Sequence, residues 1–222
     1  VVVGGSTYYA YFISRRIPNI QNLHKGIRYA AEDEIQAEMD GSVFGIANLE
    51  AYYSQELNHA LSRRNPVLIF GEVGVGKNHL AEMIYLNSQF TKNPFVFVDF
   101  TLINKQTWNF LIGHNDSPFC DSGNTLFLKN IDALDAQQIT QLVAALIEGN
   151  VAKRNRILIS CSSRRDQSTL PSVAKVIDQL SCITISMLPL RGKYGTIESS
   201  TNLLLSDYRS RHSCQVGNPD QE

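Results

Sequence analysis

The sequence is poor in cysteine and lacks long apolar runs, and both shortages exclude classes of protein. Its four cysteines, Cys120, Cys161, Cys182 and Cys214, include no pair spaced as CxxC. We therefore expect neither a zinc site nor a disulfide-stapled secreted fold, and we predict no metal ligands. No apolar stretch approaches the roughly 18 residues of a membrane helix. Free thiols, a reducing cytoplasm and no membrane partner are the expectation.

Charge is also scarce, and it is nearly balanced. Lys and Arg number 20 against 21 Asp and Glu, which gives a formal net charge of −1, and charged residues make up 18% of the chain. A chain dominated by nucleic-acid phosphate contacts is usually more basic, although a local basic patch is compatible with this balance. The hydrophobic fraction of 43% over 222 residues is that of a globular protein with a full core. The opening VVVGGSTYYAYF has no start Met and no signal pattern, as expected of a piece of a longer protein.

Short apolar runs alternate with helical periods along most of the chain. We predict helices over 49–64, 78–88, 104–112 and 136–148, and strands over 66–70, 94–100, 125–128, 156–161 and 182–187. This alternation predicts an α/β fold, a parallel five-stranded sheet between two layers of helices. A stripe of Ile27, Ala31, Ile35 and Met39 predicts another helix, from His24 to Asp40. Its apolar face would pack on its own domain or pair with a partner helix.

The sharpest motif is GEVGVGK, from Gly71 to Lys77. It follows a predicted buried strand and opens a predicted helix, which is the context of a phosphate-binding P-loop. Glycines let successive backbone N–H groups point at phosphate oxygens, and the helix N-terminus adds partial positive charge. Lys77 would reach the β- and γ-phosphates. Position 78 is Asn, where most P-loops carry a Ser or Thr that ligates Mg²⁺.

GEVGVGKNHLAEMIY resembles the GExGTGKE loop and helix of NtrC-type sigma-54-dependent transcription activators, which are AAA+ ATPases. The resemblance continues in order through VFG (43–45), PVLIFGE, NPFVFVDF, LIGH (111–114), SGNTLFL and LSCITISMLPLRGK. It covers roughly residues 43–211. It implies a three-layer αβα AAA+ core over 43–195 and the start of a helical lid with a tail over 196–222. Residues 1–42 would be a linker or helical segment of unassigned role.

Several departures from the family pattern concern catalysis. The Walker B strand TLFL is followed by Lys129 and Asn130, where the family has the Asp that holds Mg²⁺ and the Glu that activates water. Asp99 stands where the family has the Asn that pairs with that Glu, so acid and amide have traded places and could keep their hydrogen bond. The arginine-finger positions hold Val173 and Gln179, and SSRRDQ has no sensor Asn. The GAFTGA loop that touches sigma-54 is replaced by NDSPFCDSG.

We therefore expect a nucleotide-binding domain without catalytic residues, in a regulatory or assembly role within a bacterial transcription regulator. The expected ligand is ATP or ADP with little Mg²⁺ dependence, because Lys129 would bring a second positive charge toward the phosphates. The predicted binding residues are Gly71, Glu72, Val73, Gly74, Val75, Gly76, Lys77, Asn78 and Lys129.

The family also implies a sensory domain upstream and a DNA-binding domain downstream, while sigma-54 contact and a hexamer are not expected. Self-association through the helix predicted at 24–40 stays open. Three alternatives also stay open: an active ATPase with displaced catalytic groups, a nucleotide-free interaction scaffold, and a cyclic dinucleotide as the ligand.

Overall fold

A computed structural model describes residues 2–3, 6–7, 24–40, 55–88, 93–162 and 171–192, and seven more residues between 198 and 209. The VFG motif at 43–45, the positions 163–167 of SSRRDQ, Cys214 and most of the predicted lid lie outside the described residues. No helix in these ranges is both long enough and apolar enough to span a bilayer.

The chain forms one mixed sheet flanked by helices, with a separate two-stranded pair, β1 (Val2–Val3) and β2 (Ser6–Thr7). The six strands of the main sheet are β3 (Ile27–Ala30), β4 (Val67–Gly71), β5 (Phe95–Asp99), β6 (Thr125–Lys129), β7 (Arg156–Ser162) and β8 (Ile183–Met187). The labelled α-helices are α2 (Glu32–Asp40), α4 (Lys77–Leu86), α5 (Lys105–Gly113), α6 (Ala136–Glu148), α7 (Val151–Arg154) and α8 (Pro171–Leu180). Residues 55–62 are also helical, and two short 3-10 turns are η1 (Ile131–Ala133) and η2 (Leu190–Gly192).

The strand order is β3-β5-β6-β7-β4-β8. All pairs are parallel except β3 with β5, where Ile27 lies opposite Val98 and Ala30 opposite Phe95. Because parallel strands need crossover helices, α4, α5, α6 and α8 return the chain across the two faces of the sheet. The carboxyl ends of β4, β5, β6, β7 and β8 consequently meet at one edge, and the site lies there.

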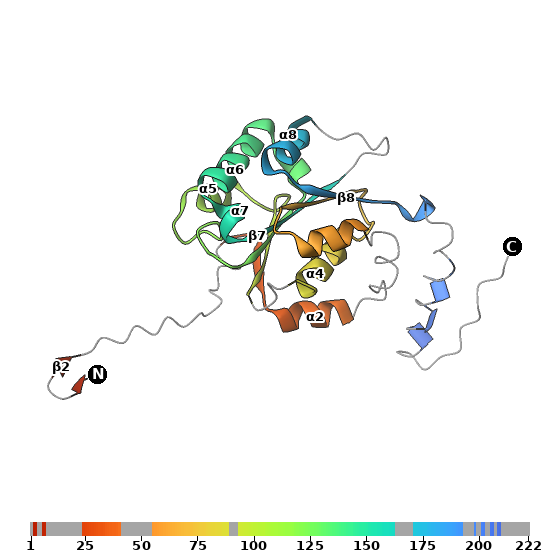
Figure 1. The fold of residues 1–222 in the computed structure, drawn as a ribbon, viewed down its shortest axis with the longest axis horizontal. Helices are drawn as coiled ribbons and strands as arrows, with labels where there is room; N and C mark the ends of the chain where they lie inside the picture. Colours follow the sequence, from red (N-terminus) through yellow and green to blue (C-terminus); the bar gives the residue numbers. More distant parts are fainter. Residues whose placement is uncertain are drawn as a thin grey trace.

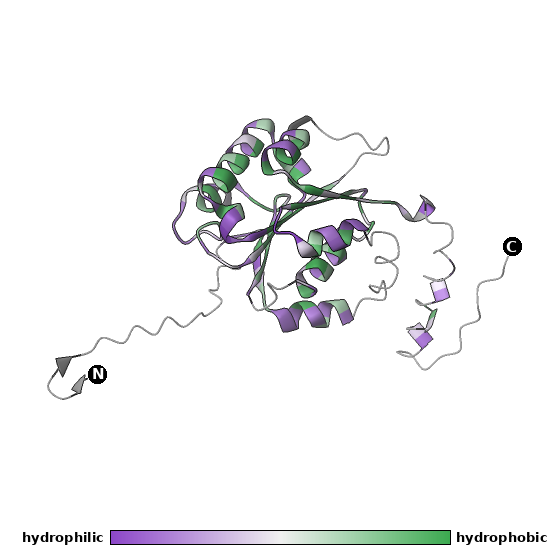
Figure 2. Cartoon of the chain, viewed as in Figure 1, coloured by the Kyte–Doolittle hydropathy of each residue, from purple (hydrophilic) through white to green (hydrophobic). Residues whose placement is uncertain are grey.

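Two apolar clusters fill the spaces on either side of the sheet. One joins the sheet to α5, α6 and α8, and the other joins it to α2, α4 and the helix at 55–62. In β4, Leu68 belongs to the first cluster, whereas Val67 and Ile69 belong to the second. Figure 1 shows the resulting three layers, and Figure 2 shows hydrophilic residues along the outer helix α2. The predicted αβα architecture is confirmed, with a sixth strand added.

The helix predicted from His24 to Asp40 is wrong in its first half. Residues Ile27–Ala30 form strand β3, and only Glu32–Asp40 is helical. The acidic run that begins at Glu32 marks the helix start, since carboxylates favour a helix N-terminus. Ile35 and Met39 are buried against the α4 side of the sheet. The apolar seam considered for self-association is therefore covered by the protein's own core.

Candidate functional site

The loop between β4 and α4 has the backbone that its sequence requires. Gly74 and Gly76 have φ values of 87° and 97°, in the left-handed region that favours glycine. Gly71 is needed for space, because a Cβ there would lie 2.9 Å from the carbonyl oxygen of Met187 on β8. Gly76 is the residue before α4, so the N–H groups of the first turn of this helix open toward the loop.

Lys77 is folded inward beneath the loop and is 9% exposed. Its ammonium donates to the carbonyl oxygens of Gly71, at 2.8 Å, and Glu72, at 2.7 Å. Burial lowers the pKa of Lys77, while the nearby Asp132 and Cys161 act in the opposite direction. An ammonium has three N–H donors, so two bonds to the loop leave one for an anion.

A hollow of about 320 Å³ lies over this lysine and the start of α4. Its lining is Val73, Gly74, Gly76, Lys77, Asn78, His79, Lys129, Asn130 and Ser162. Six of the nine predicted binding residues are in this set. Of the other three, Gly71 and Glu72 line a neighbouring hollow of about 240 Å³ at the ends of β4 and β8. The third, Val75, packs against the core on the α4 side of the sheet.

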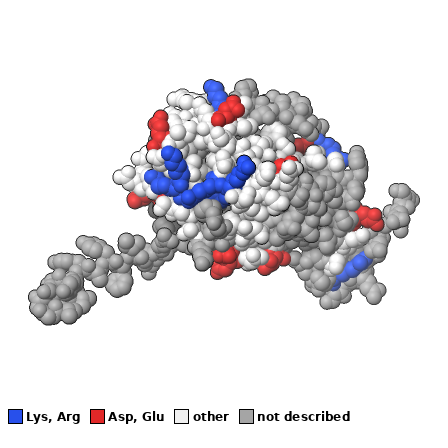
Figure 3. Space-filling view, in the orientation of Figure 1, with Lys and Arg blue, Asp and Glu red and all other residues white. Residues whose placement is uncertain are grey.

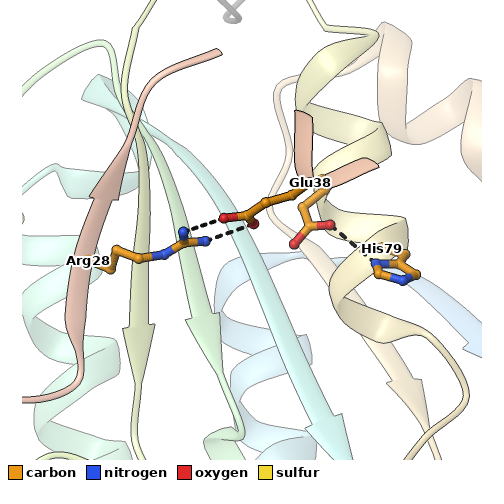
Figure 4. A network of polar contacts seen from close by, with 4 residues as sticks. Arg28, Glu38 and His79 are labelled. Carbon is orange, nitrogen blue, oxygen red and sulfur yellow. Dashed lines mark hydrogen bonds and ion pairs between the residues drawn. The ribbon is translucent and has the colours of Figure 1, made fainter. Parts of the chain in front are cut away.

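His79 lines the hollow and was not predicted as a site residue. Its Nδ1 lies 3.3 Å from Oε2 of Glu82, whose side chain is buried (Figure 4). The hydrogen bond to this carboxylate raises the pKa of His79 against the opposing effect of burial. A protonated His79 would add a cation beside Lys77. The signal was the His-x-x-Glu spacing on one helix face, but only the structure shows that Glu82 is buried.

Figure 4 also shows a second ion pair, away from the hollow, between β3 and α2. The Arg28 guanidinium donates to both carboxylate oxygens of Glu38, at 2.6 and 3.1 Å, and lies 4.0 Å from the centre of the Phe97 ring. This ion pair joins α2 to the edge strand β3. We assign it a structural role, because it connects two elements that pack on the core and lies away from the hollow.

The ends of β5 and β6 carry the exchanged acid and amide. Asn130 Nδ2 donates to Asp99 Oδ1 at 3.0 Å, which confirms the expected hydrogen bond. The Lys129 ammonium lies 3.1 Å from Asp99 Oδ2, and Thr101 donates to Oδ1 through its N–H and its hydroxyl. Burial alone would raise the pKa of Asp99, but the hydrogen bonds from Thr101, Asn130 and Lys129 bring it below its ordinary value. Asp99 is therefore a weak base, with its oxygens already engaged.

Asp132 is a second acidic group at this edge of the sheet. Its Oδ1 accepts a hydrogen bond from the N–H of Ser162 at 2.8 Å. Its charge acts on both Lys77 and Cys161. Burial, followed by the effect of Asp132, raises the pKa of the Cys161 thiol to about 12, so this thiol stays protonated at neutral pH. Sequence spacing alone does not place Asp132 near Lys77, because its position depends on the η1 turn, which follows Asn130 in a left-handed conformation.

Glu72 anchors the loop to the segment after β8. Both terminal nitrogens of Arg191 donate to the Glu72 carboxylate, one of them at 2.8 Å. The Glu72 side chain is 18% exposed. The pair joins the first turn of the P-loop to η2, which precedes the predicted lid segment 196–222. A displacement of η2 would therefore break or shift the bond between Arg191 and Glu72 of the loop.

The segment 114–124, which stands where the family pattern has the GAFTGA loop, lies flat on the core. Ser117 is buried, and its hydroxyl donates to the carbonyl of Leu111 at 2.6 Å and accepts from the N–H of Phe119. The Arg154 guanidinium donates to the Phe119 carbonyl at 2.9 Å, and the Asn155 side-chain amide donates to the Asp121 carbonyl, also at 2.9 Å. A segment held at this many points does not project from the domain.

The two predicted finger positions lie on α8. Val173 is fully buried in the core on the α5 side of the sheet, and Gln179 is exposed. Neither side chain carries a charge.

Comparisons with known proteins agree with this geometry. Residues 44–190 match the family described as Sigma-54 interaction domain. The chain is 25% identical over 167 residues to a Nif-specific regulatory protein of Rhizobium leguminosarum bv. trifolii, covering 64% of this chain and 47% of that protein. It is 22% identical over 204 residues to the Psp operon transcriptional activator of Escherichia coli, covering 81% and 61%.

Among solved structures, NtrX from Brucella abortus in complex with ATP superimposes with a TM-score of 0.63 at 16% identity, covering 82% of this chain and 47% of that one. The ADP complex of the same protein superimposes with a TM-score of 0.61 at 13% identity. These likenesses establish the AAA+ P-loop fold. The chain spans about half the length of the curated relatives it matches. Because the family match covers residues 44–190 of 222, the chain belongs to the sigma-54 interaction domain family of transcription regulators.

Proposed function

We propose that this chain is a nucleotide-binding module of a bacterial transcription regulator that binds ATP or ADP and hydrolyses it at most very slowly. The nucleotide acts as a structural or regulatory ligand. The phosphates would lie in the hollow over the loop, which Gly74, Gly76 and Lys77 line at the start of α4. His79, when protonated, would add positive charge to the same hollow, partly neutralised by the Glu82 carboxylate.

The observation that carries the proposal is the state of the Walker B end of β6. Hydrolysis needs a carboxylate that orients water and one that holds Mg²⁺. Here Lys129 and Asn130 occupy those positions, and both are bound to Asp99. Asp99 accepts from three residues and has a lowered pKa, so it does not replace the missing base.

Weak Mg²⁺ dependence follows from the lining of the hollow. None of the residues that line it in the described part of the chain is an Asp or Glu. Mg²⁺ prefers oxygen ligands and is usually held through one or two carboxylates together with substrate phosphates. Lys129 supplies positive charge instead, although its ion pair with Asp99 neutralises part of it. The charge that it offers to a phosphate is therefore smaller than that of an unpaired lysine.

A thermal scan with excess ATP, with and without EDTA, tests binding. A ligand that binds only the folded state adds about 2.7 kcal/mol at 100 times its Kd. For a domain of this size that is a rise in Tm of about 5–10 °C. We expect the rise in both conditions, and its loss in Lys77→Ala. No rise at several millimolar ATP would favour a nucleotide-free scaffold, whereas a rise abolished by EDTA would show that a metal is held after all.

Steady-state phosphate release tests hydrolysis. We expect release at background, and we expect Lys129→Asp with Asn130→Glu not to restore full turnover, because Val173 and Gln179 supply no finger. Turnover in the native chain that vanishes in Lys77→Ala would instead support an ATPase with displaced groups. Asp132, close to Lys77 at the edge of the sheet, would then be the first acid to replace.

Sigma-54 contact through the segment 114–124 is not expected, because that segment is bound to the core through Ser117, Phe119 and Asp121. A sensory domain before the chain and a DNA-binding domain after it would complete the regulator.

A further inference from the structure

Basic side chains gather at the edge of the sheet that lies opposite the P-loop. Arg63 and Arg64 precede β4, and Lys153 and Arg154 are the last two residues of α7, directly before β7. Strands β4 and β7 are adjacent and parallel, with Val67 opposite Leu158. Their amino ends therefore lie side by side, and these four residues form one surface, here called the basic edge.

Buried Arg156, at the start of β7, fixes the basic edge in place. Its guanidinium donates to the carbonyl oxygen of Arg63 at 3.0 Å and to that of Ala60. The C-terminal turn of the helix at 55–62 is thus capped by a cation from β7, which matches the negative end of the helix dipole. Burial and the charge of Arg64 lower the pKa of Arg156 to about 10, so Arg64 lies close to a second cation.

The four basic side chains are exposed. Among the described residues, no salt bridge joins Arg63, Lys153 or Arg154 to an acid. Arg154 donates one N–H to the Phe119 carbonyl, and its other N–H donors remain for a ligand. Figure 3 shows Lys and Arg in one continuous stretch on this face, around the position of α7 in Figure 1. Like charges held together repel one another, and in a chain of net charge −1 such a cluster favours an anionic partner.

We propose that the basic edge binds the phosphate backbone of duplex DNA without sequence preference. Arginine, three of the four residues, binds phosphate through two parallel hydrogen bonds, and the duplex presents a negative charge about every 1.7 Å along its axis. The choice of DNA among polyanions rests on the proposed function, which places the chain in a transcription regulator. The basic edge lies across the sheet from the nucleotide site, so both ligands can be bound at once.

Fluorescence anisotropy with a short labelled duplex of arbitrary sequence tests the proposal. Between about 50 and 200 mM salt, four phosphate contacts give a slope of about −3 to −4 for log K against log salt. The triple variant Arg63→Ala, Arg64→Ala, Lys153→Ala should lose about tenfold or more in affinity at the lower salt, and its slope should fall by about 1 per residue. Arg154 is retained because its bond to Phe119 is structural.

The matched control removes three exposed lysines outside the basic edge, Lys25, Lys105 and Lys175, and should leave affinity and slope unchanged. Equal Tm values for the two triple variants exclude unfolding as the cause. Saturating ATP should not displace the duplex. The proposal is overturned by absence of DNA binding at about 50 mM salt, by an unaffected basic-edge variant, or by displacement by ATP, which would place the anion in the P-loop.

Polyglutamate serves as a second probe for an acidic protein partner. If it binds through the basic edge and the duplex does not, the DNA proposal is overturned. The thermal scan with ATP reads the P-loop alone, so failure of nucleotide binding and failure of DNA binding are distinguishable.

Discussion

At the scale of the residue, Asp99 is the centre of the altered Walker B region. Three residues donate to its carboxylate or pair with it: Thr101, Asn130 and Lys129. Asn130 reaches it from a backbone with φ of 58°, a left-handed conformation that Asn tolerates better than most residues. Replacing Asn130 by Glu would thus impose backbone strain in addition to the repulsion between two carboxylates. The Asp99–Asn130 pair, by contrast, satisfies both the left-handed backbone at Asn130 and the charge of Asp99.

Asp99→Asn tests this arrangement through its pH dependence. Because the pKa of Asp99 is lowered in the folded state, its contribution is present above the unfolded pKa near 3.9 and is lost as the pH falls through the lower folded value. We expect the variant to be about 1 kcal/mol less stable at pH 7, given the partial exposure of the pair. The difference should shrink below about pH 4. Urea unfolding of both proteins at pH 7 and pH 3 measures it.

The control for this comparison is Asp116→Asn. The Asp116 carboxylate is 85% exposed, and removing its charge should change the free energy of unfolding little at either pH. A gap between native protein and Asp99→Asn that stays constant from pH 7 to pH 3 would show that the ionised carboxylate is not what stabilises this edge of the sheet.

At the scale of the element, α6 shows how a local signal specifies a structure. Asp135 accepts from the N–H of Gln138 at 2.7 Å, and the Gln138 side chain accepts from the N–H of Asp135 at 3.0 Å, which together form a capping box. The helix then buries Ile139, Leu142, Val143 and Leu146. The cap and the apolar stripe both lie in the helix's own sequence, which is why they can be recognised without tertiary information. The observed helix, Ala136–Glu148, confirms the predicted bounds.

Asp135→Ala should therefore destabilise the protein by about 1 kcal/mol, the usual cost of losing an N-cap side chain. Gln137→Ala, in the same exposed turn, keeps the capping box and replaces a residue with a better helix former, so it should change stability by less than about 0.5 kcal/mol. Chemical denaturation of the two variants side by side gives the comparison. Equal effects would mean that the cap contributes nothing measurable.

Elements whose pairing is distant in sequence were harder to predict. The five parallel strands can be predicted because each is an apolar run, but β3 depends on pairing with β5, nearly 70 residues later in the chain. The sequence around β3 also fits a helical stripe, and that periodicity wrongly predicts a helix there. Short α7 and helix α8 were not predicted either. The P-loop was recognisable because its glycines, lysine and flanking elements are contiguous, whereas His79 and Asp132 join the site only through burial of Glu82 and the η1 turn.

At the scale of the whole molecule, the sheet separates two kinds of surface. Its carboxyl edge carries the P-loop hollow, the Asp99 cluster and the Glu72–Arg191 pair. Its amino edge carries the cluster of Arg63, Arg64, Lys153 and Arg154 held by Arg156. Both surfaces rest on β4 and β7, which are neighbours in the sheet order. A shift of β4 or β7 would therefore displace residues at both the P-loop edge and the basic edge.

ATP should not promote assembly of this chain into a ring. In the AAA+ ring that the resemblance implies, arginine fingers of one subunit reach the nucleotide of the next, so ATP strengthens the ring. Val173 is buried in the core and Gln179 is neutral, so an ATP-bound neighbour gains no charge from either position. Light scattering should thus show the same mass with and without ATP. Gln179→Arg, at an exposed site, should fold normally and still form no hexamer, since one finger is missing; Val173→Arg should instead unfold the domain by burying a charge. A stable ATP-dependent hexamer of the native chain would contradict this account.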